Sequence, residues 1–259
     1  DSDGDIDIYF LNGAPQPANQ WKLGSQPRNA LYRNDGDWKF TDVTSTAGVG
    51  DQGHGLGVTV ADYDNDGDPD LYINNFGPNV LYRNNGDGTF SDVTTAAGVA
   101  NGSRVGAGVC FFDMDTDGDL DLYVANYVKF SYDLHVPRTK QGHPIYGSPV
   151  DYESDPDTLY RNNGDGTFTD VSRASGIAQN AGPSMATICA DVDQDGDADV
   201  LVTNDGSANF LFENDGSGRF TETGLIRGFA LDASGDAHAS MGVDATDFNH
   251  DGFPDFHVT

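Results

Sequence analysis

Short segments of small, β-branched and aromatic residues recur along the chain, separated by polar turns rich in Asp, Asn and Gly. Segments of this kind are typical of β-strands, and no helical periodicity of any length is present. In one unit the pattern predicts strands at 55–62, 70–74, 79–84 and 89–94. The turn NGDG at 85–88 favours a hairpin, because Asn-Gly and Asp-Gly tolerate positive φ. Each unit is therefore predicted to be a four-stranded antiparallel meander.

The hairpin between the third and fourth strands is repeated. It recurs as LYRNDGDWKFTDVT from Leu31, LYRNNGDGTFSDVT from Leu81, LYRNNGDGTFTDVS from Leu159 and LFENDGSGRFTET from Leu211. Repeated four-stranded units that bury their faces on one another are typical of β-propeller blades. We predict an all-β, propeller-type fold over 1–259 as a single repeat region, divided into a partial blade 1–50, blades 51–101, 102–180 and 181–235, and a partial blade 236–259.

The connection between the first and second strands carries the pattern D-x-D-x-D-G-x-x-D, as in DYDNDGDPD at 62–70. Alternate acidic side chains around a glycine turn form an oxygen cage for a hard divalent cation. We expect ligands from the side chains of loop positions 1, 3, 5 and 9 and from the backbone carbonyl of position 7. The candidate metal ligands of the five loops are Asp1, Asp3, Asp5 and Asp7; Asp62, Asp64, Asp66, Asp68 and Asp70; Asp113, Asp115, Asp117, Asp119 and Asp121; Asp191, Asp193, Asp195, Asp197 and Asp199; and Asp247, Asn249, Asp251, Phe253 and Asp255.

Calcium is favoured over magnesium, because a flexible cage rich in carboxylates suits about six to eight oxygen ligands. The loop differs from an EF-hand: position 12 is Ile73, Val124 or Val202 in place of glutamate, and strands flank it. Acidic turns without metal are the alternative, but such clusters of carboxylates would repel one another strongly. We predict Ca²⁺ at about one ion per loop, three to five in this chain, with the first and fifth loops the least complete.

The net charge of −29 arises from 42 acidic and 13 basic residues. Such a surface repels phosphate backbones and anionic headgroups, so nucleic acid and membrane surfaces are disfavoured as partners. No apolar run approaches the roughly 20 residues of a membrane span, which argues against membrane insertion. No signal peptide is visible, but the chain opens inside a metal loop, so we expect the natural amino terminus to lie upstream. The segment is expected to be part of a larger propeller or of an extended array.

The two cysteines lie in equivalent strands of neighbouring repeats. Cys110 precedes Asp113 by three residues, and Cys189 precedes Asp191 by two. This offset points the two side chains to opposite strand faces, as stacking of the repeats would require for a bridge. A disulfide and two separately buried thiols are both open, and the buried thiols are favoured.

In a meander the metal loops and the NGDG turns share one end. The long insertions at 12–28 and 127–157 both join the second strand to the third, so we expect them at the opposite end. The second insertion contains His135, His143, Pro144, Tyr146 and Pro149. It is interpreted as a packed lid, with a recognition surface as the alternative.

The remaining polar motifs have simpler interpretations. Arg33, Arg83 and Arg161 in the hairpins are expected to pair with nearby acids, and Asn101-Gly-Ser is either a glycosylation sequon or a tight turn. The six histidines show no spacing typical of a metal site. No nucleophile elbow or phosphate loop is present, and the clustered carboxylates are assigned to metal, so no catalytic residues are predicted.

The segments DYDNDGDPDLYINN from Asp62 and LYRNNGDGTFSDVTTAAGV from Leu81 resemble the FG-GAP/VCBS repeat proteins, whose calcium-binding blades also occur in integrin α chains. They are similar to bacterial proteins related to cartilage acidic protein, which often carry an ASPIC/UnbV domain that is not visible here. The resemblance covers nearly the whole chain. It implies a secreted or surface-exposed, calcium-stabilised propeller used in adhesion or in protein and glycan recognition.

The leading hypothesis is an extracellular, calcium-stabilised binding or adhesion module without catalysis, with a protein or glycan ligand. The alternative is a structural repeat protein that assembles with copies of itself into a calcium-dependent fibre or matrix. A weaker alternative is a hydrolase or lyase that acts through the long loops.

Overall fold

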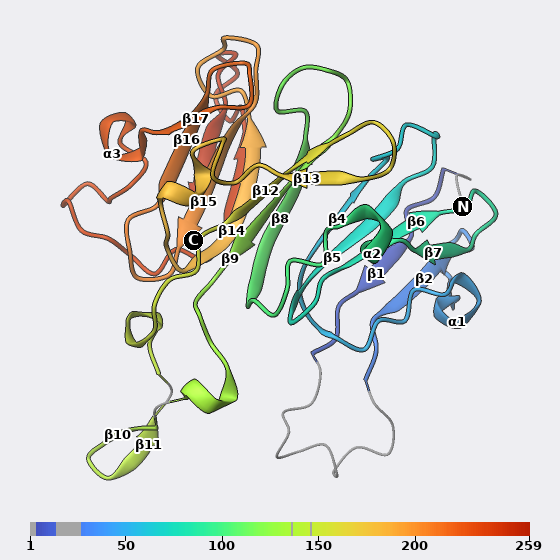
Figure 1. Ribbon diagram of the computed structural model, residues 1–259, viewed down its shortest axis with the longest axis horizontal. Coiled ribbons are helices and arrows are strands. Elements are labelled where there is room, and N and C mark those ends of the chain that lie inside the picture. Colours follow the sequence, from blue (N-terminus) through green and yellow to red (C-terminus); the bar gives the residue numbers. More distant parts are fainter. Residues whose placement is uncertain (1–3, 14–26, 136, 146) are drawn as a thin grey trace.

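The computed structural model describes residues 4–13, 27–135, 137–145 and 147–259 (Figure 1). The predicted ligands Asp1 and Asp3, most of the first insertion and Tyr146 lie outside the described residues.

Among the described residues, five of the six antiparallel sheets follow one another along the chain, and we call them blades 1 to 5. Blade 1 contains β1 (Ile8–Phe10), β2 (Ala30–Asn34) and β3 (Phe40–Asp42). Blade 2 contains β4 (His54–Ala61), β5 (Asp70–Phe76), β6 (Val80–Asn84) and β7 (Phe90–Asp92). Blade 3 contains β8 (Gly106–Phe112), β9 (Asp121–Asn126), β12 (Thr158–Asn162) and β13 (Phe168–Asp170). Blade 4 contains β14 (Ser184–Ala190), β15 (Asp199–Asn204), β16 (Phe210–Asn214) and β17 (Phe220–Glu222), and blade 5 contains β18 (Val243–Thr246) and β19 (Asp255–Val258).

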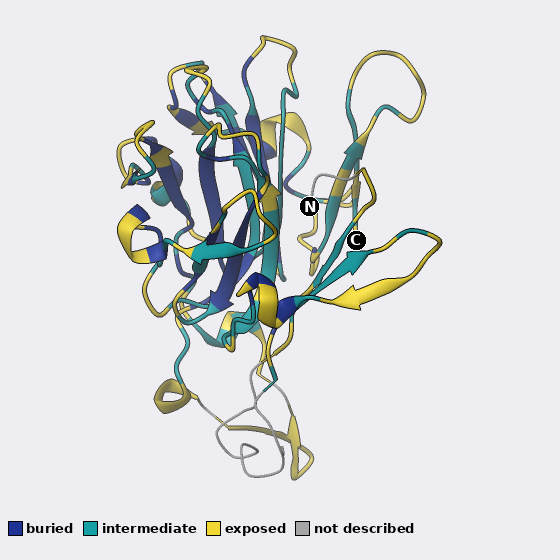
Figure 2. Cartoon of the chain, turned by 90° about the vertical axis from the view of Figure 1, so that its right-hand side faces the viewer, coloured by how far each residue is buried: buried dark blue, intermediate teal, exposed yellow. Residues whose placement is uncertain are grey.

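Within each four-stranded blade the strands pair in chain order, which is the predicted meander. The second strands β5, β9 and β15 are buried on both faces, apart from the last residue of β5 (Figure 2). A strand covered on both sides reads as a continuous apolar run, as in LYI of β5 and LYVA of β9. The predicted all-β fold of propeller-type antiparallel blades is confirmed.

The hydrophobic core lies between successive blades. One cluster joins blades 1 and 2 through Val49 and Ile73, and a second joins blades 2 and 3 through Tyr72 and Leu122. The third cluster joins blades 3 and 4, with Tyr123 among its buried members. Each blade therefore buries its faces on its neighbours, as repeat proteins do.

The first strands β4, β8, β14 and β18 lie side by side along the inner edge of the blades. There a disulfide joins Cys110 of β8 to Cys189 of β14, with their Cα atoms 6.8 Å apart. The favoured interpretation, two separate thiols, is therefore wrong. The one-residue offset does turn the two side chains toward one another, because the inner strands of adjacent blades pack closely.

Three helices of four residues follow the outer strands: α1 (Thr44–Ala47), α2 (Thr94–Ala97) and α3 (Gly224–Arg227). Each ends at a glycine with φ of 80° or 81°, the left-handed conformation that glycine adopts readily. One helical turn is too short to produce a periodic pattern, so the sequence does not predict these helices. Within the described residues, no helix is long and apolar enough to cross a membrane.

The second insertion leaves β9 and returns at β12 through η2 (Tyr132–Leu134), the hairpin β10 (Arg138–Lys140) with β11 (His143–Ile145), and η3 (Pro149–Asp151). Figure 1 shows it extending from the end of the blades opposite the β8–β9 and β14–β15 loops, as predicted. Both strands of its hairpin are exposed, as are His135, His143 and Pro144 (Figure 2). The interpretation as a packed lid is therefore wrong for the described part. Packing is confined to its base, where the ring of Phe130 contacts Phe76 and Tyr152.

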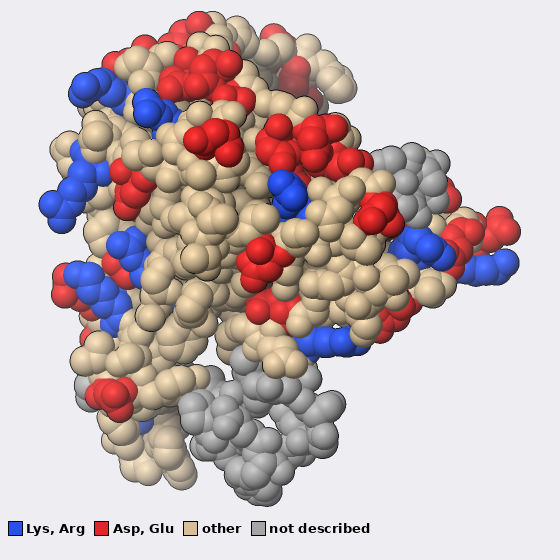
Figure 3. All heavy atoms as spheres, turned by 45° about the vertical axis from the view of Figure 1, so that its right-hand side comes forward, with Lys and Arg blue, Asp and Glu red and all other residues tan. Residues whose placement is uncertain are grey.

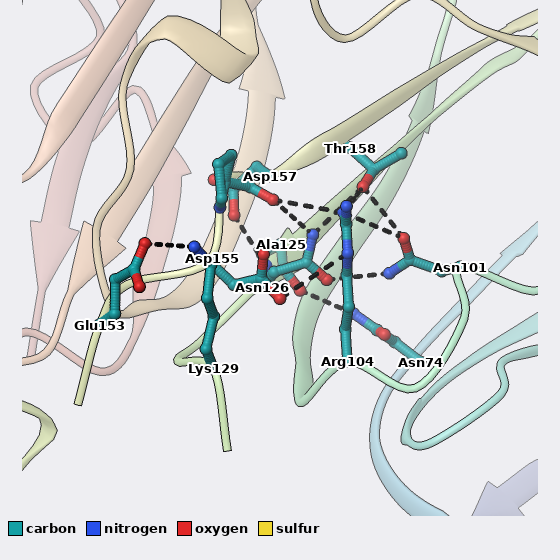
Figure 4. Close-up of polar contacts among 11 residues, drawn as sticks. Asn74, Asn101, Arg104, Ala125, Asn126, Lys129, Glu153, Asp155, Asp157 and Thr158 are labelled. Carbon is teal, nitrogen blue, oxygen red and sulfur yellow. Dashed lines mark hydrogen bonds and ion pairs between the residues drawn. The ribbon is translucent and has the colours of Figure 1, made fainter. Parts of the chain in front are cut away.

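The sequon at Asn101 is part of a tight turn. Asn101 has φ of 56°, and its side-chain Nδ2 donates a hydrogen bond to Asn126 Oδ1 at 2.8 Å. Its Oδ1 accepts from Thr158 Oγ1 at 3.0 Å (Figure 4). Because both ends of the amide are engaged, the turn explains this sequence and glycosylation is not required.

Candidate metal centres

The loops between the first and second strands share one backbone conformation. The residue at the fourth position has φ between 57° and 63° in each of four loops, at Asn65, Thr116, Gln194 and His250. The glycine at the sixth position has φ from 90° to 99° in the same loops, and Gly4 has 95°. Non-glycine residues adopt positive φ at a cost, so surrounding contacts must hold this turn.

The first-position aspartate supplies those contacts. Asp62 accepts hydrogen bonds from the backbone N–H of Asp66 at 3.1 Å and of Gly67 at 2.9 Å. The same pair of bonds forms at Asp113 and at Asp247, and Asp191 accepts from Gly196 at 3.1 Å. The carboxylate at this position therefore closes the turn by capping its backbone donors.

The ninth-position aspartate ties the loop to the blade. Asp70 is fully buried, and it accepts from the backbone N–H of Tyr63 at 3.1 Å and of Asn84 at 2.7 Å. Asp121 and Asp199 make the equivalent two bonds in blades 3 and 4. Because Asn84 ends the third strand, this one carboxylate fixes the metal loop and the hairpin against one another.

Three loops bring acidic oxygens together. Oxygens of Asp62, Asp64 and Asp66 lie within 4.8 Å of one another, as do those of two further sets: Asp113, Asp115 and Asp121, and Asp191, Asp193 and Asp199. In each set one buried oxygen, Oδ1 of Asp64, Asp115 or Asp191, has no hydrogen-bond partner among the described residues. A buried carboxylate oxygen without a donor is costly, and a cation between the converging carboxylates would satisfy it. The residues present therefore fit a hard divalent ion.

The seventh-position side chain lies against the hairpin of its own blade. A Cβ atom on Gly86 would stand 2.7 Å from Asp68 Oδ2, and one on Gly164 would stand 2.8 Å from Asp119 Oδ2. These glycines have positive φ as well, so both space and backbone favour glycine there. The seventh-position carboxylate therefore lies beside the hairpin glycine, and it is not a member of the converging sets in these loops. The metal loops and the NGDG turns do share one end of the blades.

Without a counter-charge, the electrostatics of these acidic cages are unfavourable. Burial, with the neighbouring acids adding to it, raises the pKa of Asp70 and of Asp121 to about 7, although backbone N–H donors partly oppose the shift. Burial and the nearby Asp195 raise the pKa of Asp197 to about 6. Clusters of acidic side chains cover this end of the molecule in Figure 3. A bound divalent cation would favour the charged carboxylates and remove this penalty.

The first and fifth loops are less complete. In the first loop Asp7 accepts from the backbone N–H of Asn34 at 2.8 Å, while its first residues lie outside the described chain. In the fifth loop Asn249 stands at the third position, and the acids Asp247, Asp251 and Asp255 do not form a converging set in the described structure. Phe253, expected to offer its carbonyl, has a side chain that is 53% exposed. The fifth loop keeps the turn but presents fewer carboxylates, and of the first loop only the part from Gly4 onward is described.

The hairpin residues complete the surroundings. Arg33 pairs with Asp35 at 2.7 Å, as predicted. The charge of Arg83 partly offsets the raised pKa of Asp64, whose main cause is burial. The sequence interpretation missed the hairpin asparagines: Asn162 Nδ2 donates to the Tyr63 carbonyl of the preceding loop at 2.8 Å. The sequence feature that could have revealed these residues is the asparagine that recurs at the same place in LYRN and LFEN.

A propeller-type repeat protein with acidic loops at one end of its blades is the class that this fold and these sites define. The FG-GAP-like repeat family matches residues 1–73, 63–124, 146–202 and 191–258, which together are most of the chain. The chain belongs to the FG-GAP-like repeat family, as its resemblance predicted.

Three individual proteins are similar to a part or to most of this chain. Cartilage acidic protein 1 of Xenopus tropicalis is 43% identical over 53 residues, which are 20% of this chain and 8% of that protein. A lectin of Agrocybe aegerita that recognises non-reducing terminal N-acetylglucosamine has a TM-score of 0.41 and 20% identity, over 89% of this chain and 60% of the lectin. Rhamnogalacturonan lyase YesW has a TM-score of 0.40 and 14% identity, over 92% of this chain and 49% of the lyase. With TM-scores below 0.5, neither structure bears on the function.

Proposed function

We propose that this chain is an extracellular, calcium-stabilised, propeller-type binding module without catalytic activity. The observation that carries this proposal is the convergence of three acidic oxygens in each of three loops, each with one buried oxygen that lacks a donor. Asp64, Asp115 and the other members of these sets would hold Ca²⁺, which would supply charge neutralisation and cross-linking of the loop. In this proposal the acidic side chains stabilise the fold by binding Ca²⁺ and do not take part in catalysis.

Two further observations support the extracellular binding role. A disulfide between Cys110 and Cys189 is stable in an oxidising compartment and rare in the cytosol. In the exposed insertion, acidic and basic groups pair with one another, as Arg138 does with Asp151 and Lys129 with Glu153. Paired surface charges of this kind suit a contact surface for a protein or glycan better than acid–base catalysis.

Calcium dependence of unfolding tests the proposal. Ligand that binds only the native state stabilises it by roughly 2.7 kcal/mol per site at a hundredfold excess over Kd, so three filled sites give about 8 kcal/mol. We expect EDTA to lower the melting temperature strongly and added Ca²⁺ to restore it. Asp66→Ala should remove about one third of this calcium-dependent stabilisation, the part contributed by one site. Scanning calorimetry in Ca²⁺ and in EDTA measures it.

Asp87→Ala is the matched control, because Asp87 is an exposed hairpin acid of the same blade that caps its own turn through Thr89. It should leave the calcium-dependent shift unchanged. A melting temperature indifferent to EDTA would contradict the calcium role. Retention on a glycan or protein array would support binding, whereas turnover of a saccharide would contradict the absence of catalysis.

A further inference from the structure

Neighbouring metal loops are joined directly by an amide side chain at two places. Asn65 Nδ2 donates to Asp119 Oδ1 at 2.8 Å and to the Gly118 carbonyl at 3.4 Å. Gln194 Nε2 donates to the Gly252 carbonyl at 2.6 Å. In both pairs the donor stands at the fourth position of one loop, and the carbonyl belongs to the sixth position of the next. The same contact thus recurs between blades 2 and 3 and between blades 4 and 5.

The junction between blades 3 and 4 lacks this contact. Its fourth-position residue is Thr116, whose hydroxyl donates to the carbonyl of its own neighbour Asp115 at 2.8 Å. Threonine is shorter than asparagine or glutamine, and within the described chain no bond from Thr116 reaches the loop of blade 4. The disulfide stands at this junction instead. The three junctions therefore offer an internal comparison.

The accepting groups belong to the part of the loop that would present a ligand. The Gly118 carbonyl lies one peptide before the Asp119 carbonyl, which is the expected seventh-position ligand. Asp119 Oδ1 accepts the Asn65 amide, and its Oδ2 lies beside Gly164, where a Cβ atom would stand 2.8 Å away. Asn65 itself lies between Asp64 and Asp66, two members of the converging set in its own loop. An ion that orders those two ligands also orders the residue between them.

We propose that Asn65 and Gln194 are positioning residues that couple adjacent metal centres. An ion in the loop of blade 2 fixes the Asn65 amide, which then holds the loop of blade 3 in its binding conformation. Gln194 links the centre of blade 4 to the loop of blade 5 through the same kind of bond, whereas the centres of blades 3 and 4 are not coupled through their loops. By linkage the effect is reciprocal, so each member of a pair raises the affinity of the other. This inference rests on the proposed calcium function.

Calcium titration of the whole chain by isothermal calorimetry tests the coupling. Asn65→Gly removes the amide and keeps positive φ accessible, and Thr116→Gly is its matched control at the same loop position in blade 3. Both side chains are exposed and both residues have φ near 57°. Threonine is the more strained of the two in this conformation, so Thr116→Gly should relieve at least as much backbone strain, and a loss of affinity seen only in Asn65→Gly reports the missing amide. We expect Asn65→Gly to weaken the affinity of two sites about fivefold, which is the lower end of typical coupling, and to flatten the isotherm. The number of bound ions should stay unchanged in both variants. Thr116→Gly should change the calcium affinity by less than about twofold.

Further variants separate the explanations. Asp66→Ala disables the loop of blade 2, and in that background Asn65→Gly should have little further effect on the remaining sites. Gln194→Gly should weaken the centre of blade 4, whose loop it links to that of blade 5, and leave the centres of blades 2 and 3 unaffected. Equal isotherms for Asn65→Gly and Thr116→Gly, with calcium still bound, would overturn the coupling alone. Failure of the unmodified chain to bind Ca²⁺ would overturn both this inference and the proposed function.

Discussion

Blade 3 packs on two neighbours, and its two interfaces bury similar cores but are linked differently at their ends. Both interfaces receive a hairpin asparagine at the loop end: Asn162 reaches the Tyr63 carbonyl, and Asn214 reaches the Met114 carbonyl, each at 2.8 Å. The side toward blade 2 adds the Asn65 amide bridge. The side toward blade 4 adds the disulfide in the inner strands.

The opposite ends of the blades differ as well, and Figure 4 shows Asn74, Ala125 and Asp157 in this region. Toward blade 2, Asn74 Nδ2 donates to the carbonyls of Ala107 and Ala125 at 3.2 and 3.0 Å, so a neutral amide makes the link. Toward blade 4, the buried carboxylate of Asp157 accepts from Tyr123 Oη at 2.7 Å and Ser184 Oγ at 2.9 Å. Beyond the hairpin asparagine that both share, the interface toward blade 2 is linked by amide donors, and the interface toward blade 4 is linked by a covalent bond and a buried carboxyl group. The repeat determines the apolar core, while these end contacts are free to differ.

The largest expected difference between the interfaces comes from removing the disulfide. Its closed loop spans 79 residues, and the chain-entropy model gives a loss of about 4 kcal/mol for opening a loop of that length. We expect the variant with both Cys110→Ser and Cys189→Ser to show this loss in urea unfolding. Protection from amide exchange should fall in β8 and β14 more than in β4 and β5.

Dithiothreitol added to the unmodified chain provides the control, because it opens the same bond without changing volume or polarity. It should reproduce most of the loss and leave the doubly substituted chain unaffected. Equal loss of exchange protection at both interfaces of blade 3 would show that the bond stabilises the whole stack and not one junction.

Much of this architecture follows from sequence, because the repeated elements carry local signals. Alternation and turn residues predict the ends of β4 to β7 to within two residues. The loop pattern includes the acids that converge around Asp64 and Asp115, but it also includes Asp70 and Asp117, which are not members of these converging sets. The links between blades lack such signals. Predicting the disulfide would have required knowing how closely two inner strands approach. Predicting the Asn65 bridge would have required knowing how two neighbouring loops are placed relative to one another. Both are properties of packing between segments more than 50 residues apart in sequence.

The second expected difference is pH dependence at the blade 3–4 interface. Burial raises the pKa of Asp157 to about 7 from its ordinary 3.8, with the nearby Asp155 adding slightly and three hydrogen-bond donors opposing the shift. Between about pH 4 and 7 the unfolded chain has lost this proton and the folded chain retains it, so stability falls as pH rises. At about 1.4 kcal/mol per unit, the loss approaches roughly 4 kcal/mol.

Asp157→Asn removes the titration and keeps the side chain's shape. We expect the stability of the unmodified chain relative to this variant to fall between pH 4 and 8, measured by urea unfolding in EDTA. The acids of the metal loops titrate equally in both proteins and cancel in the difference. Asn74→Ala, at the other interface, should lower stability by a constant amount over this range. Parallel curves for Asp157→Asn and the unmodified chain would contradict the assignment.

The smallest expected effect concerns two glycines at which inner strands touch. A Cβ atom on Gly57 of β4 would stand 2.0 Å from the Ala107 carbonyl oxygen, and one on Gly108 of β8 would stand 2.7 Å from the Thr187 nitrogen. Both neighbours are backbone atoms, so alanine forces the strands apart, at a cost of about 1 to 3 kcal/mol for overpacking. We expect Gly57→Ala to cost more than Gly108→Ala, with Val60→Ala at an exposed site of β4 as the control.

Reduction should then distinguish the two substitutions. The disulfide holds β8 against β14, so Gly108→Ala strains a tethered pair of strands, and opening the bond lets them separate. The cost of Gly108→Ala, measured by urea unfolding, should therefore be smaller in dithiothreitol, while the cost of Gly57→Ala should be the same in both conditions. If reduction relieved both substitutions equally, the two interfaces would be mechanically continuous through β8, and the contrast between an amide-linked and a covalently linked side of blade 3 would fail.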